Sequence, residues 1–107
     1  MKKKVLVSAS ILSADFSVLG AEVEKVLACG ADMIHLDVMD GCFVPNITIG
    51  PAVIKAIRKL TPVIFDTHLM IKKPEKYIAN FREAGADILT VQVETCPHLQ
   101  RTLTYIK

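Results

Sequence analysis

Short apolar runs alternate with amphipathic stretches along the whole chain. The apolar runs are Val5 to Ala9, Met33 to Val38, Val63 to Leu69 and Ile88 to Val93. Runs of this length, rich in valine and isoleucine, are typical of buried β-strands. Between them, apolar residues recur three and four positions apart, which predicts helices that pack one face against the strands. The alternation of strand and helix indicates an α/β fold with a parallel sheet.

Four groups of apolar residues have helical spacing, and the third is expected to face the sheet. They are Leu19, Val23, Val26 and Leu27; Val53, Ile54, Ile57 and Leu60; Tyr77, Ile78 and Phe81; and Leu99, Leu103 and Ile106. Ser17 is the expected N-cap of the first helix, and Pro51 and Pro74 are expected to open the second and third. Gly30 and Gly85 are expected to end the first and third.

Four strand-helix units amount to half of an eight-stranded (β/α)8 TIM barrel, which typically takes about 250 residues. We expect residues 1–107 to form a single half-barrel domain. Such a sheet has two unpaired edges and an uncovered apolar face, so we predict a homo-oligomer or association with a complementary half-barrel. The alternative is a small doubly wound sheet with helices on both faces. It is disfavoured because no glycine-rich phosphate-binding turn follows the first strand.

A short internal repeat supports this division into units. The segment Gly30-Ala31-Asp32-Met33-Ile34 recurs as Gly85-Ala86-Asp87-Ile88-Leu89. The repeat places Thr90 and Gln92 at the positions of His35 and Asp37, so the fourth strand lacks the chemistry of the second. The competing interpretation is that Gly-Ala-Asp is simply a good turn from helix to strand.

Composition excludes several classes of function. The chain is 51% apolar and 22% charged, with a formal charge of +2. Its only basic cluster, Lys2-Lys3-Lys4, is read as a solvated terminus, so we expect no nucleic-acid partner. No apolar run is long enough to span a membrane, and Met1 to Ala14 fits a first strand better than a secretory signal. Three cysteines without a CxxC pair favour reduced thiols and a cytoplasmic protein.

The candidate chemistry lies on the second and third strands. Successive strand residues point to opposite faces, so His35 and Asp37 share one face of their strand, and Asp66 and His68 share one face of the next. If these strands are neighbours, His35, Asp37 and His68 converge into a site suited to Zn²⁺, Fe²⁺, Mn²⁺ or Co²⁺. The alternative is that the histidines are hydrogen-bonded core residues without a metal.

Three segments resemble one enzyme family. They are Ser8 to Phe16, His35 to Gly41 with the following Phe43 to Asn46, and Asp66 to Met70. Together they resemble the N-terminal half of the ribulose-phosphate 3-epimerase family, and the similarity runs from Val5 to Lys107. The chain departs from that pattern at Ala9, where proline is more usual, and at Gln92, where the family usually has histidine.

The resemblance implies a sugar-phosphate substrate and a reaction that inverts C3 of ribulose 5-phosphate through an enediolate. It implies that His35, Asp37 and His68 bind a divalent metal and that Asp37 is also a catalytic acid/base. It further implies that Ser10 and His68 contact the substrate and that Met39 and Met70 line the pocket, although ordinary packing explains the methionines equally well.

The second acid/base and the phosphate-binding loops of the family belong to its other half. The site is therefore expected to be incomplete in this chain alone. The competing reading is a catalytically inactive half-barrel that self-associates and still binds a divalent metal. A related barrel decarboxylase is disfavoured because neither the second nor the third strand contains the lysine that such enzymes use.

Overall fold

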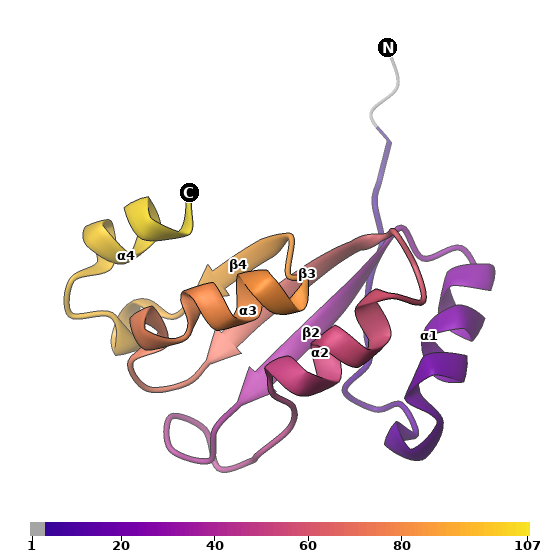
Figure 1. Ribbon diagram of the computed structural model, residues 1–107, viewed down its shortest axis with the longest axis horizontal. Helices are drawn as coiled ribbons and strands as arrows, with labels where there is room; N and C mark the ends of the chain where they lie inside the picture. The colour runs from indigo at the N-terminus through magenta and orange to yellow at the C-terminus, as the bar shows by residue number, and fades with distance from the viewer. Residues whose placement is uncertain (1–3) are drawn as a thin grey trace.

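The computed structural model describes residues 4–107, which form one four-stranded parallel sheet (Figure 1). The strands are β1 (Ser8–Ser10), β2 (Met33–Met39), β3 (Ile64–Met70) and β4 (Ile88–Val91), in the spatial order β1-β2-β3-β4. The α-helices are α1 (Leu19–Ala28), α2 (Pro51–Arg58), α3 (Ile78–Ala84) and α4 (Leu99–Ile106). Three 3-10 helices are η1 (Phe16–Val18), η2 (Pro74–Lys76) and η3 (Val93–Thr95).

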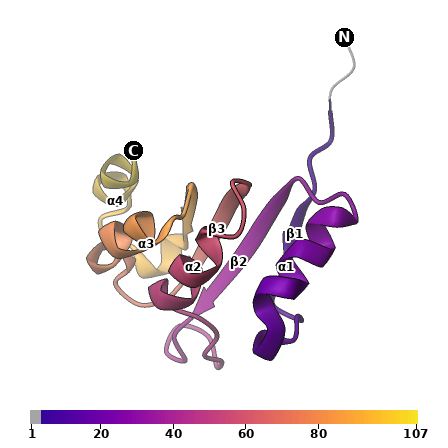
Figure 2. The same ribbon diagram turned by 45° about the vertical axis from the view of Figure 1, so that its right-hand side comes forward.

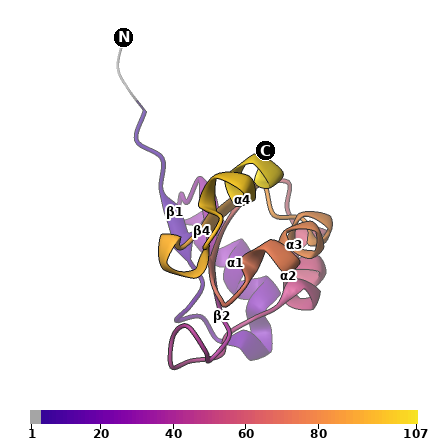
Figure 3. The same ribbon diagram turned by 90° about the vertical axis from the view of Figure 1, so that its left-hand side faces the viewer.

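Helices α1, α2 and α3 lie on the same side of the sheet, as Figures 2 and 3 show from two directions. Each one connects a strand to the next parallel strand beside it. Connections of one hand between strands in sequential order place every crossover helix on one face. This arrangement is that of half a TIM barrel, as predicted, and it excludes the doubly wound sheet.

The core fills the space between the sheet and these helices. Along β2, Ile34, Leu36 and Val38 are buried, and the residues between them are partly exposed. On β3 the buried positions are Phe65, Thr67 and Leu69. The strict alternation means that one face of the sheet packs on the helices while the other remains open.

The two Gly-Ala-Asp segments form the same turn. Gly30 and Gly85 both have positive φ, at 109° and 123°, a conformation that glycine adopts without a Cβ penalty. Asp32 pairs with the backbone of Val7 through both its N–H and its carboxylate, and Asp87 pairs with Phe65 in the same way. Each aspartate thus ties the start of one strand to the neighbouring strand.

Arg58 lies at the N-terminal ends of β3 and β4 and joins the segments that lead into these two strands. Its guanidinium donates to the carbonyl oxygens of Gly85 and Thr61, at 2.9 and 2.8 Å, and also to that of Val63. It pairs with the Asp87 carboxylate at 2.8 Å and lies 3.7 Å above the ring of Phe65. A planar group with five N–H donors can make these contacts together, whereas a lysine ammonium cannot.

Several element boundaries differ from the sequence-based predictions. β1 begins at Ser8 rather than Val5, and β4 ends at Val91 rather than Val93, because the chain turns there into η3. Ser17 lies inside η1 and does not cap α1, whose N-cap is Val18 without a side-chain hydrogen bond. The side-chain cap of this region is Asp15, which accepts the Ser17 N–H at the start of η1.

The third predicted helix is divided between η2 and α3. Tyr77 lies at the junction, where its side chain is 47% exposed rather than facing the sheet. Two other predicted helix-face residues, Leu60 and Leu103, are also largely exposed.

Lys2 and Lys3 of the basic cluster lie outside the described residues. Lys4 is exposed, and its ammonium lies 3.6 Å from the Asp32 carboxylate. Within residues 4–107, no helix combines the length and apolar character required to cross a lipid bilayer.

Candidate functional site

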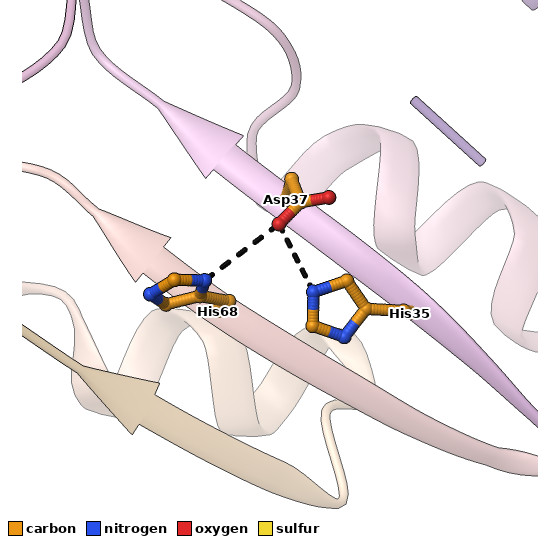
Figure 4. A group of neighbouring side chains, drawn as sticks. All are labelled: His35, Asp37 and His68. Carbon is orange, nitrogen blue, oxygen red and sulfur yellow. Dashed lines mark hydrogen bonds and ion pairs between the residues drawn. The ribbon is translucent and has the colours of Figure 1, made fainter. Parts of the chain in front are cut away.

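His35, Asp37 and His68 converge on the open face of the sheet, near the C-terminal ends of β2 and β3. The parallel register pairs Asp37 with His68 and His35 with Asp66, and strand alternation turns all four side chains to the same face. One ligand atom from each of His35, Asp37 and His68 lies within 4.8 Å of the other two. Figure 4 shows the two imidazoles directed towards the Asp37 carboxylate.

His35 lies between two carboxylates. Its Nε2 is 3.0 Å from Asp37 Oδ1, and its Nδ1 is 2.9 Å from Asp66 Oδ2. Partial burial disfavours the charged ring, but the hydrogen bond to Asp66 and the negative charge of Asp37 outweigh it and raise the pKa of His35 above its ordinary value. A cation bound at Nε2 would displace the proton there, while Nδ1 would keep its proton and donate it in the hydrogen bond to Asp66.

His68 presents its Nδ1 to the cluster, 3.7 Å from Asp37 Oδ1. Its Nε2 is hydrogen-bonded to the Oε1 atom of Gln92, which follows β4. The Gln92 amide nitrogen donates to Glu94, which fixes the amide with its oxygen towards the histidine. Because that oxygen can only accept, this hydrogen bond is made by the Nε2–H tautomer of His68, in which Nδ1 is available to a ligand.

The other predicted site residues border this cluster. The Ser10 hydroxyl, on β1, donates to Asp37 Oδ2 at 3.1 Å. Met39 and Met70 are paired in register at the last positions of β2 and β3, on the same face as the ligand atoms. All six predicted residues therefore share the open face, with Ser10 bonded to the cluster and the two methionines at the strand ends beyond it.

Asp66 is a site residue that the sequence analysis noted but gave no role. Besides holding His35, its Oδ2 accepts the Ser8 hydroxyl at 2.9 Å. The signal was present in the sequence, because Asp66 precedes His68 by two residues and so lies on the same strand face. Its partner was hidden, because only the register of β2 against β3 reveals that Asp66 lies opposite His35.

The donor set fits a divalent transition metal. Two imidazole nitrogens and one carboxylate oxygen are preferred ligands of Zn²⁺ and of Fe²⁺, Mn²⁺ or Co²⁺, and three protein ligands leave positions open for a substrate. Each imidazole also has an outer acceptor, Asp66 or Gln92, which fixes its tautomer as in known metal sites. The side chains of His35 and His68 remain 26% and 24% exposed, so they are not core residues.

Comparison with known proteins connects this geometry to one family. The model of the ribulose-phosphate 3 epimerase family matches residues 6–107. The ribulose-phosphate 3-epimerase of Bacillus subtilis (strain 168) is 57% identical over 103 residues, covering 96% of this chain and 48% of that protein. The enzymes of the same name from Synechocystis and Escherichia coli K12 are 59% and 49% identical and cover 100% and 98% of this chain. This chain spans about half the length of these curated relatives.

Proposed function

Because this chain belongs to the ribulose-phosphate 3-epimerase family, we propose that it supplies the metal-binding half of an isomerase that interconverts ribulose 5-phosphate and xylulose 5-phosphate. The observation that carries this proposal is the convergence of His35, Asp37 and His68 on one face of the sheet. The substrate in this proposal is taken from the names of the relatives. The metal-assisted chemistry in this proposal is inferred from the position of the three ligands.

The reaction inverts C3, so one group must remove the C3 proton from one face while another returns a proton to the opposite face. Asp37 is the proposed acid/base. Its Oδ1 faces the two imidazoles, and its Oδ2, held by Ser10 at 3.1 Å, is the oxygen left for proton transfer. A divalent cation at the cluster, Zn²⁺, Fe²⁺, Mn²⁺ or Co²⁺ in this proposal, would stabilise the negative charge that develops on the substrate oxygens.

Ser10, His68, Met39 and Met70 are the proposed substrate contacts. Ser10 offers a hydroxyl beside Asp37, and the two methionines form an apolar border at the ends of the strands. An apolar border excludes water from the reacting carbon, which strengthens the electrostatic interactions within the site. The substrate would thus meet polar groups on β1 to β3 and thioethers at the rim.

We further propose that the site is completed by a second copy of the chain or by a complementary half-barrel. Within residues 4–107, β1 and β4 each pair on one side only, and Ile64 and Ile88 are 43% and 42% exposed on the face that carries the ligands. Covering this face would bury apolar surface and enclose the ligands.

The free thiols of Cys29, Cys42 and Cys96 are consistent with a reducing compartment, so we propose a cytoplasmic location.

Hydrogen exchange at C3 tests the proposed reaction. Metal-loaded protein of known oligomeric state is incubated with ribulose 5-phosphate in deuterated water, and the deuterium at C3 is followed by NMR. We expect exchange that is lost in Asp37→Asn, because an amide cannot accept the C3 proton. Glu24→Gln, an exposed change on α1, is the matched control and should leave the exchange rate unaltered.

A metal-loaded assembly that shows no exchange would contradict the catalytic proposal. The second candidate, an inactive half-barrel that self-associates and binds a metal, would then account for the same ligand cluster. It is favoured by one observation, the coverage of about half of each relative. Metal binding measured by calorimetry separates the two questions, because it depends on the cluster and not on turnover.

A further inference from the structure

A cavity of about 750 Å³ lies away from the ligand cluster, on the helix-covered side of the sheet. It is bordered by the C-terminal end of β2, the segment leading into α2, and the segment from η2 to α3. None of the three ligand residues His35, Asp37 and His68 lines this cavity, whereas Met39, the last residue of β2, borders both the cavity and the open face. Its volume is in the range of pockets that hold small organic ligands.

The inner wall of this cavity is apolar. Val38, Val53 and Phe81 contribute to it, and two largely exposed apolar residues, Ile47 and Tyr77, stand at its border. An isoleucine 77% exposed beside a concave apolar wall leaves apolar surface in water that a ligand could cover. The wall therefore fits the apolar body of a ligand.

The border of the cavity is cationic. Lys72, Lys73 and Lys76 all line it, and among residues 4–107 no carboxylate lies within ion-pair distance of their ammonium groups. The one lining carboxylate, Asp40, already accepts the backbone N–H groups of Lys72, Cys42 and Phe43. Three free cations around an apolar wall attract a ligand of negative charge.

The start of α2 adds to this positive potential. Gly50 and Pro51 line the cavity, and Gly50, as N-cap, offers no side chain to the first-turn N–H groups. The N-terminal end of a helix carries a partial positive charge. Both the lysines and this helix end thus favour an anion at the same border.

We propose that this cavity binds a small amphiphilic anion, a compact molecule with an apolar body and one carboxylate, sulfonate or phosphate group. The apolar body lies against Val53 and Phe81, and the anionic group lies near Lys72 and Lys76. The cavity contains none of the three metal ligands, and its binding of an anion does not depend on the reaction proposed above.

A matched pair of fluorescent probes tests the proposal. Anilinonaphthalene sulfonate has an aromatic body and one sulfonate, and phenylnaphthylamine has the same body without the charge. We expect one site for the sulfonate, with an affinity about tenfold higher than that of the neutral probe, a difference of about 1.4 kcal/mol. Equal affinities would overturn the role of the lysines.

Variants locate the bound probe. The double change Lys72→Gln with Lys76→Gln should weaken the sulfonate about tenfold and leave the neutral probe within about twofold. Lys55→Gln with Lys59→Gln, two exposed lysines of the α2 region that do not line the cavity, is the charge control and should change neither affinity. An equal loss in this control would overturn the assignment.

Val53→Trp should fill the cavity and abolish binding of both probes. Ile64→Lys with Ile88→Lys alters the open face of the sheet and should leave binding unchanged. If Val53→Trp fails to fold, NMR of the unmodified chain replaces it, with the amide signals of Thr48, Val53 and Phe81 expected to shift on addition of the sulfonate. Shifts confined to the open face, or binding lost with the Ile64 and Ile88 changes, would overturn the proposal.

Discussion

At the scale of single residues, His35 shows how the site is held in place. Its ring bridges Asp37 and Asp66, which come from different strands and bond to different ring nitrogens. Asp66 therefore orients the ring and leaves Nε2 for the cluster. A carboxylate in this outer position also makes the imidazole a stronger ligand.

We predict that Asp66→Asn weakens binding of Zn²⁺ or Co²⁺ by about 10- to 100-fold without unfolding the chain. The amide can still accept from His35 Nδ1, but it lacks the negative charge that supports the ring. Titration calorimetry on the metal-free protein measures the loss. Ser8→Ala removes only the other hydrogen bond to Asp66, so a loss of similar size in that variant would contradict the assigned role.

Gly85 illustrates a residue fixed by both conformation and space. Its φ is 123°, and a Cβ at this position would lie 2.2 Å from Cδ of Arg58. Arg58 cannot swing away without losing its bonds to the turn and to Asp87. Both the positive φ and the close approach of Arg58 therefore favour glycine at this position.

We expect Gly85→Ala to lower the free energy of unfolding by about 3 kcal/mol, through backbone strain and the displaced arginine. Gly30→Ala is the matched control, because its φ is 109° but nothing lies within 4 Å of the added Cβ. It should cost only the strain, about 1 kcal/mol. Urea denaturation followed by circular dichroism compares them, and equal losses would show that the contact with Arg58 contributes nothing.

At the scale of elements, Asp40 joins the two loops that follow β2 and β3. Its Oδ1 accepts the N–H groups of Cys42 and Phe43 at 2.8 and 3.0 Å, and its Oδ2 accepts that of Lys72 at 2.8 Å. The hydrogen bond from Lys72, followed by those within its own loop, lowers the pKa of Asp40 below the ordinary 3.8. The negative charge thus stabilises the C-terminal ends of the strands.

This lowered pKa predicts a pH-dependent contribution to stability. The stabilisation by Asp40 should be complete above its unfolded pKa and lost as the pH falls through its lower, folded pKa. Asp40→Asn should therefore reduce stability by about 1 kcal/mol near neutral pH, a modest figure because water partly screens the carboxylate. The difference from the unmodified chain should shrink at about pH 2.5.

Urea denaturation at the two pH values measures this effect. Glu24→Gln replaces an exposed carboxylate that the structure leaves outside such a network, so it should show little difference at either pH. A deficit of Asp40→Asn that persists unchanged in acid would contradict the role of the charge.

At the scale of the whole molecule, the sheet is covered on one face only. The open face carries the ligand cluster and, nearer the N-terminal ends of the strands, the exposed side chains of Ile64 and Ile88. Ile88 lies opposite Asp66 in the β3–β4 register. The proposed assembly therefore covers the apolar pair and encloses the ligand cluster together.

We predict that Ile64→Lys with Ile88→Lys shifts the assembly towards monomer in light scattering while the circular dichroism spectrum is retained. Charges placed on a buried interface are costly, whereas the same lysines are tolerated on an open surface. Leu60→Lys is the control, because Leu60 is 45% exposed but lies beside Gly20 of α1, on the helix layer. Dissociation by Leu60→Lys alone would place the interface elsewhere.

The alternation of apolar runs and helical spacings was sufficient to predict the parallel sheet and the order of its elements. Periods of two and 3.6 residues depend on local geometry, so they can be read without knowing the fold. The ends of elements were less accurate. Asp15 caps a short η1 that precedes α1, and β4 stopped at Val91, because competing side-chain and backbone hydrogen bonds decide such boundaries.

By itself, the sequence determined that His35 and Asp37 share one strand face, and likewise Asp66 and His68, because side-chain direction alternates along any strand. Only the tertiary structure decided that Asp37 faces His68, that Asp66 holds His35, and that Gln92 reaches His68 from beyond β4. It also placed three lysines around the cavity between α2 and α3. Strand register and helix packing are set by contacts between distant segments, and no local pattern in the chain encodes those contacts.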